Sequence, residues 1–403
     1  MSGEPHPSRN PPAAPTSEST DALPRRSSMK PRPLAALLPL LLLLAACSRP
    51  SCAGPVSPEA ARRIARFDAH AHIHPYDTAR ALEIYGRSGI VGFANASGGH
   101  GAALEAALEA ARPFAGRVAV FANWNPQGFL QPGWVEREVD GLRRAKALGA
   151  KGLKIYKALG LGFADPDGRR VAVDDPRLDP IFAECGRLGL VIDIHTGDPQ
   201  AFFEPPTADN ERWEELAHNP GWSFHGPGFP SWEQLFSEYE RRVARHPGTR
   251  FIGIHFGNAP EQPERVAAML RRYPNLYVDT AARLGEIGRT PPFDLRKIFV
   301  EHRERILFGT DFGLFGPEMT LGAPEATRPG PAEADLFFER HWLFFETRGR
   351  GIAHPTPIQG RWSIDAIGLP EEVLHDLYHR NAERLLGLPA LGASPREARE
   401  LTP

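Results

Sequence analysis

Short apolar runs alternate with longer amphipathic segments between about residue 65 and residue 390. Each run is rich in Val, Ile, Phe and Ala, which is typical of parallel strands buried on both faces. The runs occupy residues 66–72, 89–94, 118–123, 151–156, 190–195, 250–255, 276–279 and 306–311. The clearest helical patterns between them cover residues 101–112, 134–148, 180–188, 232–245 and 263–272. Eight strands that alternate with helices predict an α/β fold, a closed (β/α)8 or TIM barrel over residues 65–390.

An open doubly wound sheet is the alternative, but it needs a glycine-rich phosphate turn after its first strand. No such turn follows residues 66–72. The region is longer than the roughly 250 residues of a typical barrel, so we expect the surplus in long loops. These loops follow the fifth and eighth predicted strands, at residues 196–230 and 312–331. Loops that follow barrel strands lie over the catalytic face, where they could act as lids.

The first residues have a different composition from the rest of the chain. Residues 1–28 are dense in Pro, Ser and charge, and predict either a disordered leader or a start codon assigned too early, with Met29 as the true start. A basic stretch and the apolar run 34–46 follow. That run is shorter than the roughly 20 residues of a membrane-spanning helix. It therefore predicts a secretory signal over residues 29–47.

The end of this run, Leu44-Ala45-Ala46-Cys47, resembles the lipobox of bacterial lipoproteins. The resemblance implies export, cleavage before Cys47, lipidation of its thiol and anchoring to a membrane. In such lipoproteins, Ser48 after the cysteine usually accompanies sorting to the outer membrane. The alternative is an ordinary secretory signal with a chance cysteine. We expect residues 48–64 to form a tether, and residues 391–403 to form a tail.

The overall charge excludes one class of partner. Lys and Arg total 47 and Asp and Glu total 49, which gives a formal net charge of −2. Nucleic-acid binding needs a basic excess that displaces counterions from phosphates, so no nucleic acid is expected. The expected partners are a small-molecule substrate and, through the lipid, a membrane. The sequence does not indicate an oligomeric state.

Candidate chemistry gathers where the predicted strands end. The first strand carries an Asp-Ala-His-Ala-His-Ile-His motif, and alternation places Asp68, His70, His72 and His74 on one face. The fifth, sixth and eighth strands end in the residues His195, His255 and Asp311. Strand ends converge on one mouth in a barrel. Imidazole and carboxylate groups are the ligands of zinc or a similar divalent ion, which predicts a metal site.

These motifs, in this order, resemble the amidohydrolase superfamily, and most closely its amidohydrolase 2 branch of metal-dependent barrel proteins. The Gly309-Thr310-Asp311 turn matches as well, and residues 378–386 resemble the closing helix of that branch. The resemblance implies that His70, His72, His195 and Asp311 bind a single metal. It also implies that His255 is a catalytic or orienting imidazole and that Asp311 transfers a proton.

The resemblance implies an enzyme, a metal-dependent hydrolase in which metal-bound hydroxide attacks an amide, ester or lactone carbonyl. Two alternatives stay open. The same site serves non-oxidative decarboxylases and hydratases in this branch, and fold and ligand set do not separate these reactions. The third hypothesis is an inactive, surface-anchored binding lipoprotein.

Lys154, on the fourth strand, bears on the number of metals. It resembles the lysine that is carboxylated in binuclear members and bridges two ions. In that case His195 and His255 would both serve the second metal. The alternatives are a second-shell or substrate-binding lysine and a solvent-facing lysine.

Four further residues have weaker signals. Asn123 ends the third strand, Arg283 follows the seventh, and His225 lies in the first long loop. Each is a candidate for binding substrate, and Arg283 could clamp a carboxylate. The alternatives are a core tryptophan for Trp124, which adjoins Asn123, a surface salt bridge for Arg283 and an exposed loop histidine for His225. Asp193, near His195, is a candidate for orienting that or another ligand.

Overall fold

The computed structural model describes residues 54–197, 199–324 and 328–391. The expected leader (1–28), the signal segment (29–47) with the lipidation site Cys47, and nearly all of the tail lie outside the described residues. Within the described ranges, no helix is long and apolar enough to cross a membrane.

A sheet with strand order β10-β9-β1-β2-β3-β4-β5-β6-β7-β8 forms the centre of the described fold. Neighbouring strands from β1 to β8 are parallel, β9 is parallel to β1, and β10 runs antiparallel to β9. The strands are β1 (Arg66–Ile73), β2 (Ile90–Asn95), β3 (Val118–Asn123), β4 (Gly152–Ile155), β5 (Val191–Ile194), β6 (Phe251–Gly253), β7 (Leu276–Asp279), β8 (Ile306–Leu307), β9 (Phe312–Phe315) and β10 (Glu318–Leu321). Strands β11 (Ile352–Ala353) and β12 (Ser363–Ile364) form a separate antiparallel pair.

The two ends of the parallel series lie next to each other. The N–H of Ala69, in β1, donates to the carbonyl of Phe308 at 2.8 Å, and Phe308 directly follows β8. The N–H of Asp311 donates to the carbonyl of His70 at 2.9 Å. The chain that leaves β8 therefore runs alongside β1. The predicted α/β class with a curled, parallel sheet is confirmed, and its connectivity is consistent with a TIM barrel.

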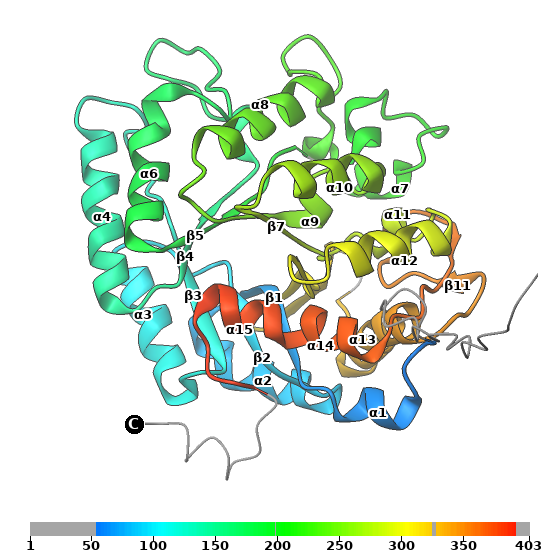
Figure 1. Cartoon of the computed structure of the whole chain (residues 1–403). Helices are drawn as coiled ribbons and strands as arrows, with labels where there is room; N and C mark the ends of the chain where they lie inside the picture. Colours follow the sequence, from blue (N-terminus) through cyan, green and yellow to red (C-terminus); the bar gives the residue numbers. More distant parts are fainter. Residues whose placement is uncertain (1–53, 198, 325–327, 392–403) are drawn as a thin grey trace, which may run out of the picture. The chain divides into compact units, whose positions relative to one another are not determined.

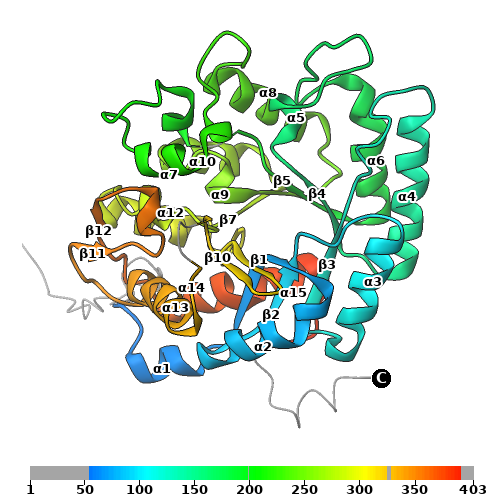
Figure 2. The ribbon, with the colours of Figure 1, turned by 180° about the vertical axis from the view of Figure 1, so that it is seen from behind.

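The helices pack outside the strands; α3, α4 and α6 stand side by side in both views (Figures 1 and 2). The α-helices are α1 (Pro58–Arg63), α2 (Thr78–Arg87), α3 (Ala102–Ala111), α4 (Trp134–Leu148), α5 (Ala158–Leu161), α6 (Asp179–Leu188), α7 (Trp213–His218), α8 (Trp232–Arg245), α9 (Ile254–Gly257), α10 (Pro263–Arg272), α11 (Leu284–Ile287), α12 (Pro292–Glu301), α13 (Pro331–Glu346), α14 (Glu371–His375) and α15 (Asn381–Leu386). Short 3-10 turns and one π-helical turn complete the described elements: η2 (Pro75–Asp77), η3 (Arg112–Phe114), η4 (Pro176–Leu178), η5 (Gln200–Phe203), η6 (Pro220–Trp222), η7 (Pro357–Gln359) and η8 (Asp376–Arg380).

Local sequence explains where these helices begin and which face they bury. Ser231 caps α8, since its hydroxyl accepts the N–H of Gln234 at 3.1 Å. Leu235, Tyr239 and Val243 then lie at helical spacing and are all buried. The outer helices of the fold are therefore amphipathic, as the sequence pattern predicts.

The inner side of the curled sheet carries an apolar cluster away from the predicted site. Inner residues of several strands form one cluster with the last helix, α15: Phe67, Ala69, Ala94, Ala119, Phe121, Val191, Ile252, Ile254, Leu307, Ala382, Leu385 and Leu386. Helix α15 therefore packs against the inner cluster of the sheet, and the polar residues at the opposite strand ends are left to form a cavity.

Three segments differ from the sequence expectation. The segment after β5 contains η5, α7 and η6 before α8 begins. The segment after β8 contains the hairpin β9–β10. Residues 54–64, expected to be part of a tether, include helix α1, whose Ala61 is buried, and the N–H of Val56 donates to the carbonyl of Leu369 at 3.3 Å.

Candidate metal centre and its cavity

The first strand does not keep the regular alternation expected for its polar residues. Its register against β2 shifts between Asp68 and Ala71. As a result Asp68 contacts helix α2, where it accepts a 2.7 Å hydrogen bond from the Tyr85 hydroxyl, while His70 and His72 line a cavity. His74 is exposed and accepts the N–H of Tyr76. The expectation that all four polar residues share one face is therefore wrong.

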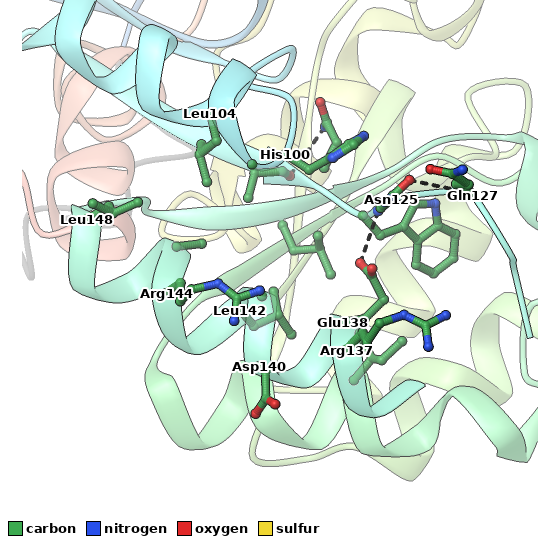
Figure 3. Close-up of a pocket in the computed structure, with 18 of the residues that line it drawn as sticks. His100, Leu104, Asn125, Gln127, Arg137, Glu138, Asp140, Leu142, Arg144 and Leu148 are labelled. Carbon is green, nitrogen blue, oxygen red and sulfur yellow. Dashed lines mark hydrogen bonds between the residues drawn. The ribbon is translucent and has the colours of Figure 1, made fainter. Parts of the chain in front are cut away.

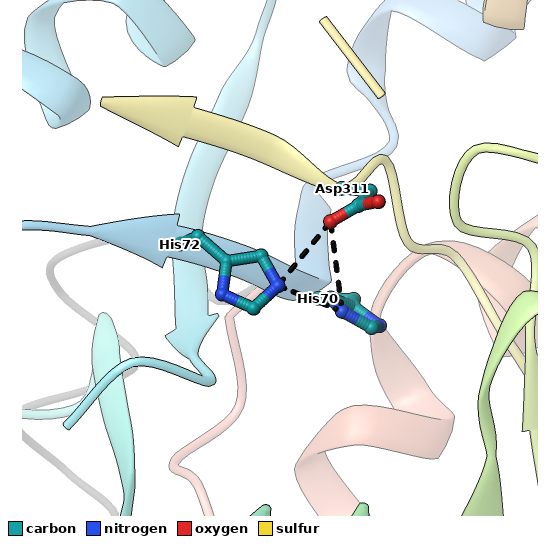
Figure 4. Close-up of side chains that lie close together, drawn as sticks. All are labelled: His70, His72 and Asp311. Atoms are coloured by element: carbon teal, nitrogen blue, oxygen red, sulfur yellow. Dashed lines mark hydrogen bonds and ion pairs between the residues drawn. The ribbon is translucent and has the colours of Figure 1, made fainter. Parts of the chain in front are cut away.

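His70, His72 and Asp311 converge at the mouth of the sheet (Figure 4). His72 Nε2 lies 3.3 Å from Asp311 Oδ1 and 3.3 Å from His70 Nε2, and His70 Nε2 lies 3.7 Å from the same carboxylate oxygen. Ligand atoms about 2.1 Å from a tetrahedral zinc ion lie roughly 3.4 Å from one another. The three side chains therefore fit a divalent cation between them.

Both imidazoles are held by the nitrogen that faces away from this point. His70 Nδ1 lies 2.8 Å from Asp279 Oδ2, and His72 Nδ1 lies 2.7 Å from the Ser97 hydroxyl oxygen. Such contacts fix the orientation of a metal-binding ring. Both rings consequently present Nε2 to Asp311.

Burial and neighbouring charges set the protonation of the three groups. Burial, together with nearby Lys154, lowers the pKa of His70 to about 3. Burial alone would raise the pKa of Asp311, but the hydrogen bond from His72 and the surrounding positive groups outweigh it and bring the pKa to about 2. A neutral imidazole and an ionised carboxylate are the forms that bind a divalent cation.

His255 follows β6 in a strained conformation. Its φ is 53°, in the left-handed region that non-glycine residues rarely adopt, and the φ of Asp311 is 62°. His255 Nδ1 lies 2.8 Å from the carbonyl oxygen of Ala281. A carbonyl only accepts, so Nδ1 carries the proton and Nε2 carries the lone pair. Burial and nearby Arg283 lower the pKa of His255 well below its ordinary value.

The three converging side chains form one wall of a cavity of about 230 Å³. Its other lining residues include four predicted site residues, His195, His255, Lys154 and Arg283. The ring of His195 meets that of His255 edge-on, with centroids 4.6 Å apart. Among the described residues, His195 is not in the compact group of His70, His72 and Asp311. The structure thus places His195 beside the predicted catalytic imidazole.

Lys154 is buried, with 1% of its surface exposed, so the solvent-facing alternative is wrong. Its Nζ lies 3.1 Å from Asp193 Oδ2 and 3.3 Å from His70 Nε2. Asp193, which was a candidate for orienting a histidine ligand, thus forms an ion pair with Lys154. Lys154 is also a lining residue of the cavity, next to the candidate metal centre.

Two predicted substrate-binding residues lie elsewhere. Asn123 lines a different cavity, of about 340 Å³, beside α3 and α4 (Figure 3). Its amide accepts the N–H of Gly99 at 2.7 Å and donates to the carbonyl of Ala96 at 3.0 Å, which fastens the chain after β2. His225 is exposed, with Nδ1 3.3 Å from the carbonyl of Phe203. Neither lines the cavity of the candidate metal centre. Arg283 does line it, and only 5% of Arg283 is exposed.

The segment after β5 supplies cavity residues that sequence reasoning missed: Phe202, Glu215 and Trp222. Glu215 is held by Arg212, whose guanidinium lies 2.7 Å from Glu215 Oε2 and also pairs with Glu286 of α11. All three charged groups are buried. The helices that carry them are short, so no periodicity in the sequence marks them.

A family model described as amidohydrolase, Amidohydro_2, matches residues 67–388. The chain belongs to the amidohydrolase family. Members of this family bind a divalent metal, which agrees with the His and Asp group at the mouth of the sheet. The resemblance expected from the strand-end motifs is thus confirmed for the family. No curated protein matches this amidohydrolase.

Several solved structures are similar to this amidohydrolase. A dihydroxybenzoic acid decarboxylase from Polaromonas sp. JS666, with bound manganese and an inhibitor, is 15% identical, with 81% of this chain and 97% of that chain covered and a TM-score of 0.46. The hydratase for 4-oxalomesaconate from Rhodopseudomonas palustris is 13% identical, with coverage of 80% and 95% and a TM-score of 0.45. Dihydroorotase from Campylobacter jejuni is 14% identical, with coverage of 81% and 84% and a TM-score of 0.44.

Proposed function

We propose that this amidohydrolase is a metal-dependent hydrolase that acts on an amide, ester or lactone bond of a small molecule. The observation that carries the proposal is the convergence of His70, His72 and Asp311, three metal-ligating groups with their ligand atoms mutually within 4.8 Å. Two imidazoles and a carboxylate suit zinc, which we propose as the native ion. His195, which lines the same cavity, is the candidate for a further ligand.

A bound divalent cation would polarise a substrate carbonyl and lower the pKa of a water molecule. The protein supplies the proton transfers. Asp311 is ionised and a fifth of its side chain is exposed, so it is placed to accept a proton and pass it to a leaving group. His255 presents its unprotonated Nε2 because Nδ1 bonds to Ala281, so it can accept a hydrogen bond from substrate.

The cavity indicates the kind of substrate. Phe202, Trp222 and Phe315 supply apolar walls, Lys157 and Arg283 are cationic, and the acidic Glu215 is paired with Arg212. A volume of about 230 Å³ limits the substrate to a small molecule. The combination favours a substrate with a flat apolar part and an acidic group.

The two cations also favour the second candidate function. A non-oxidative decarboxylase or a hydratase of a carboxylate substrate would use Lys157 and Arg283 to hold the anion, with the same metal ligands. In a decarboxylase the carbon–carbon bond to the carboxylate breaks, carbon dioxide leaves, and a proton takes its place. In a hydrolase no carbon dioxide forms.

Metal content and reaction products test this proposal. The purified protein, grown with zinc or manganese, is expected to retain metal, and the double variant His70→Ala, His72→Ala is expected to lose most of it. A panel of lactones, amides, esters and aromatic acids, assayed for hydrolysis and for released carbon dioxide, separates the two functions. A folded protein that holds no metal under replete conditions would instead favour the inactive binding lipoprotein.

The number of ions is a separate point. We infer one ion. The Lys154 ammonium pairs with Asp193 and lies 3.3 Å from His70 Nε2. A carboxylated Lys154 would be a bridge only if a second metal lay beside it. Elemental analysis is expected to give close to one metal per chain. A value close to two would support the carboxylated bridge.

We further propose that the protein is exported and held by a lipid on Cys47 at a bacterial membrane, more specifically the outer membrane. The support is the apolar run that ends in the lipobox. Cys47→Ser is expected to release the protein from the membrane fraction, and retention of this variant would contradict the proposal.

A further inference from the structure

One buried carboxylate touches both halves of the candidate site. Asp279 ends β7 and is fully buried. Its Oδ2 lies 2.8 Å from His70 Nδ1, and its Oδ1 accepts the N–H groups of His255 at 2.8 Å and Ala281 at 3.1 Å. A single side chain therefore contacts a candidate metal ligand and the backbone of the candidate catalytic imidazole.

The contact with His70 decides which ring nitrogen carries the proton. The Lys154 ammonium, a donor only, lies 3.3 Å from His70 Nε2, so Nε2 accepts and Nδ1 carries the proton that it donates to Asp279. The lone pair of the neutral ring then lies on Nε2, the atom that points to His72 and Asp311. The opposite tautomer would place a proton at Nε2, where it would block coordination.

The contact with His255 supports a strained backbone. His255 has φ 53° and the next residue, Phe256, has φ 56°. Two consecutive non-glycine residues in the left-handed region cost of order 1–3 kcal/mol each and persist only where the surroundings hold them. The bond from the His255 N–H to Asp279 is one of the contacts that hold this turn.

The side chains of His70 and Asp279 pack closely around Gly309. A Cβ atom added at Gly309 would lie 3.1 Å from His70 Cβ and 3.4 Å from Asp279 Cβ. The side chains of His70 and Asp279 thus meet beside Gly309, which has a hydrogen where other residues have a Cβ atom. Their approach is built into the fold around the turn that leads to Asp311.

We propose that Asp279 is a positioning residue that sets His70 in its metal-binding tautomer and fixes the backbone of His255. It does not touch the substrate in this role and acts through the two histidines. The inference rests on the proposed metal site, but the tautomer of His70 can be observed without any metal.

The substitution Asp279→Asn tests the proposal because asparagine has nearly the same shape. Its carbonyl oxygen can accept the N–H groups of His255 and Ala281, which turns its NH₂ group toward His70 Nδ1. That nitrogen must then accept, which moves the proton to Nε2 and sets it against the Lys154 ammonium 3.3 Å away. Metal affinity is expected to fall about 10- to 100-fold.

Asp68 offers a matched control. It is equally buried, its Oδ1 accepts two backbone N–H groups (His70 and Thr310), and its Oδ2 accepts the hydroxyls of Tyr85 and Thr310. Hydroxyls can accept as well as donate, so Asp68→Asn keeps the same four partners, with the two hydroxyl bonds reversed in direction. This variant is expected to bind metal within about threefold of the wild type.

Two measurements read the outcome. Cobalt(II) titration followed by visible absorption gives the metal affinity, and ¹⁵N NMR of the metal-free protein at pH 8 reports the tautomer of His70. We expect Nδ1–H in the wild type and in Asp68→Asn, and Nε2–H in Asp279→Asn. Nε2–H in the wild type would overturn the proposal, and that spectrum needs no variant to fold. Equal loss of affinity in both variants would also overturn it. A wild type that binds no cobalt but shows Nδ1–H would refute the metal site and leave the positioning role of Asp279 standing.

Discussion

Replacing Arg212 by methionine is expected to destabilise the segment that covers the cavity. The Arg212 side chain is fully buried and pairs with Glu215 of α7 and Glu286 of α11. Methionine keeps much of the apolar stem but removes the charge, which leaves two carboxylates buried without their cation. The substitution therefore weakens the packing of the segment after β5 against the turn after β7.

The size of the effect follows from burial. Removing one partner of a buried ion pair costs about 3–5 kcal/mol, because the remaining charge is left desolvated. The exposed pair Arg271–Glu301, with side chains 49% and 37% exposed, provides the comparison. Breaking an exposed pair costs about 0–1 kcal/mol. Arg212→Met should therefore lose several times more stability than Arg271→Met.

Urea unfolding and limited proteolysis together measure this difference. We expect Arg212→Met to lose about 3–5 kcal/mol of unfolding free energy and to be cleaved faster between residues 196 and 230. Adding Glu215→Gln and Glu286→Gln should recover part of the loss, because neutral amides are cheaper to bury than unpaired carboxylates. Substitutions at the protein surface usually change the unfolding free energy by no more than about 0.5 kcal/mol. An equally small change for Arg212→Met would refute the reasoning.

Three further predictions concern pH, packing and metal. Burial lowers the pKa of His341 from 6.5 to about 4, so the folded state resists protonation of this group. The unfolding free energy should therefore fall by about 3 kcal/mol as the pH drops from 6.5 to 4. His341→Phe should remove this fall from the pH dependence of urea unfolding. Gly309→Ala places a methyl group 3.1 Å from His70 Cβ, and should cost about 1–3 kcal/mol in unfolding free energy and weaken cobalt binding. Metal at 100 times its Kd should raise the unfolding free energy by about 2.7 kcal/mol in the wild type, and not in His70→Ala combined with His72→Ala; an equal rise in that variant would contradict the site.

The sequence was sufficient for the alternation of strands and helices because burial on both faces leaves a clear apolar pattern. It was insufficient for the segments after β5 and β8. Helix α7 and strands β9 and β10 are short, and no period can be read from so few residues. Their place over the cavity depends on contacts such as that of Arg212 with Glu286, whose partners lie far apart in the chain.

The sequence was likewise sufficient for some residues of the site and insufficient for others. His70, His72 and Asp311 were predicted to meet and do so, because the strand ends of a parallel barrel converge. Asn123 had the right position at a strand end, yet its amide bonds to the neighbouring loop and it lines another cavity. Position at a strand end predicts nearness to the mouth, whereas the direction of one side chain depends on its hydrogen-bond partners.

The strands that carry the candidate reacting groups end earlier than the apolar pattern predicts. Apolar runs extend over residues 250–255 and 306–311, but β6 ends at Gly253 and β8 at Leu307. His255 and Asp311 lie just beyond these ends, both with left-handed φ. A residue in that conformation cannot continue a strand, and in both cases the backbone N–H is bonded, that of His255 to Asp279 and that of Asp311 to the carbonyl of His70. These hydrogen bonds fasten His255 and Asp311 at turns beyond the strand ends, and both residues line the cavity. A pattern of apolar residues gives no sign of such bonds.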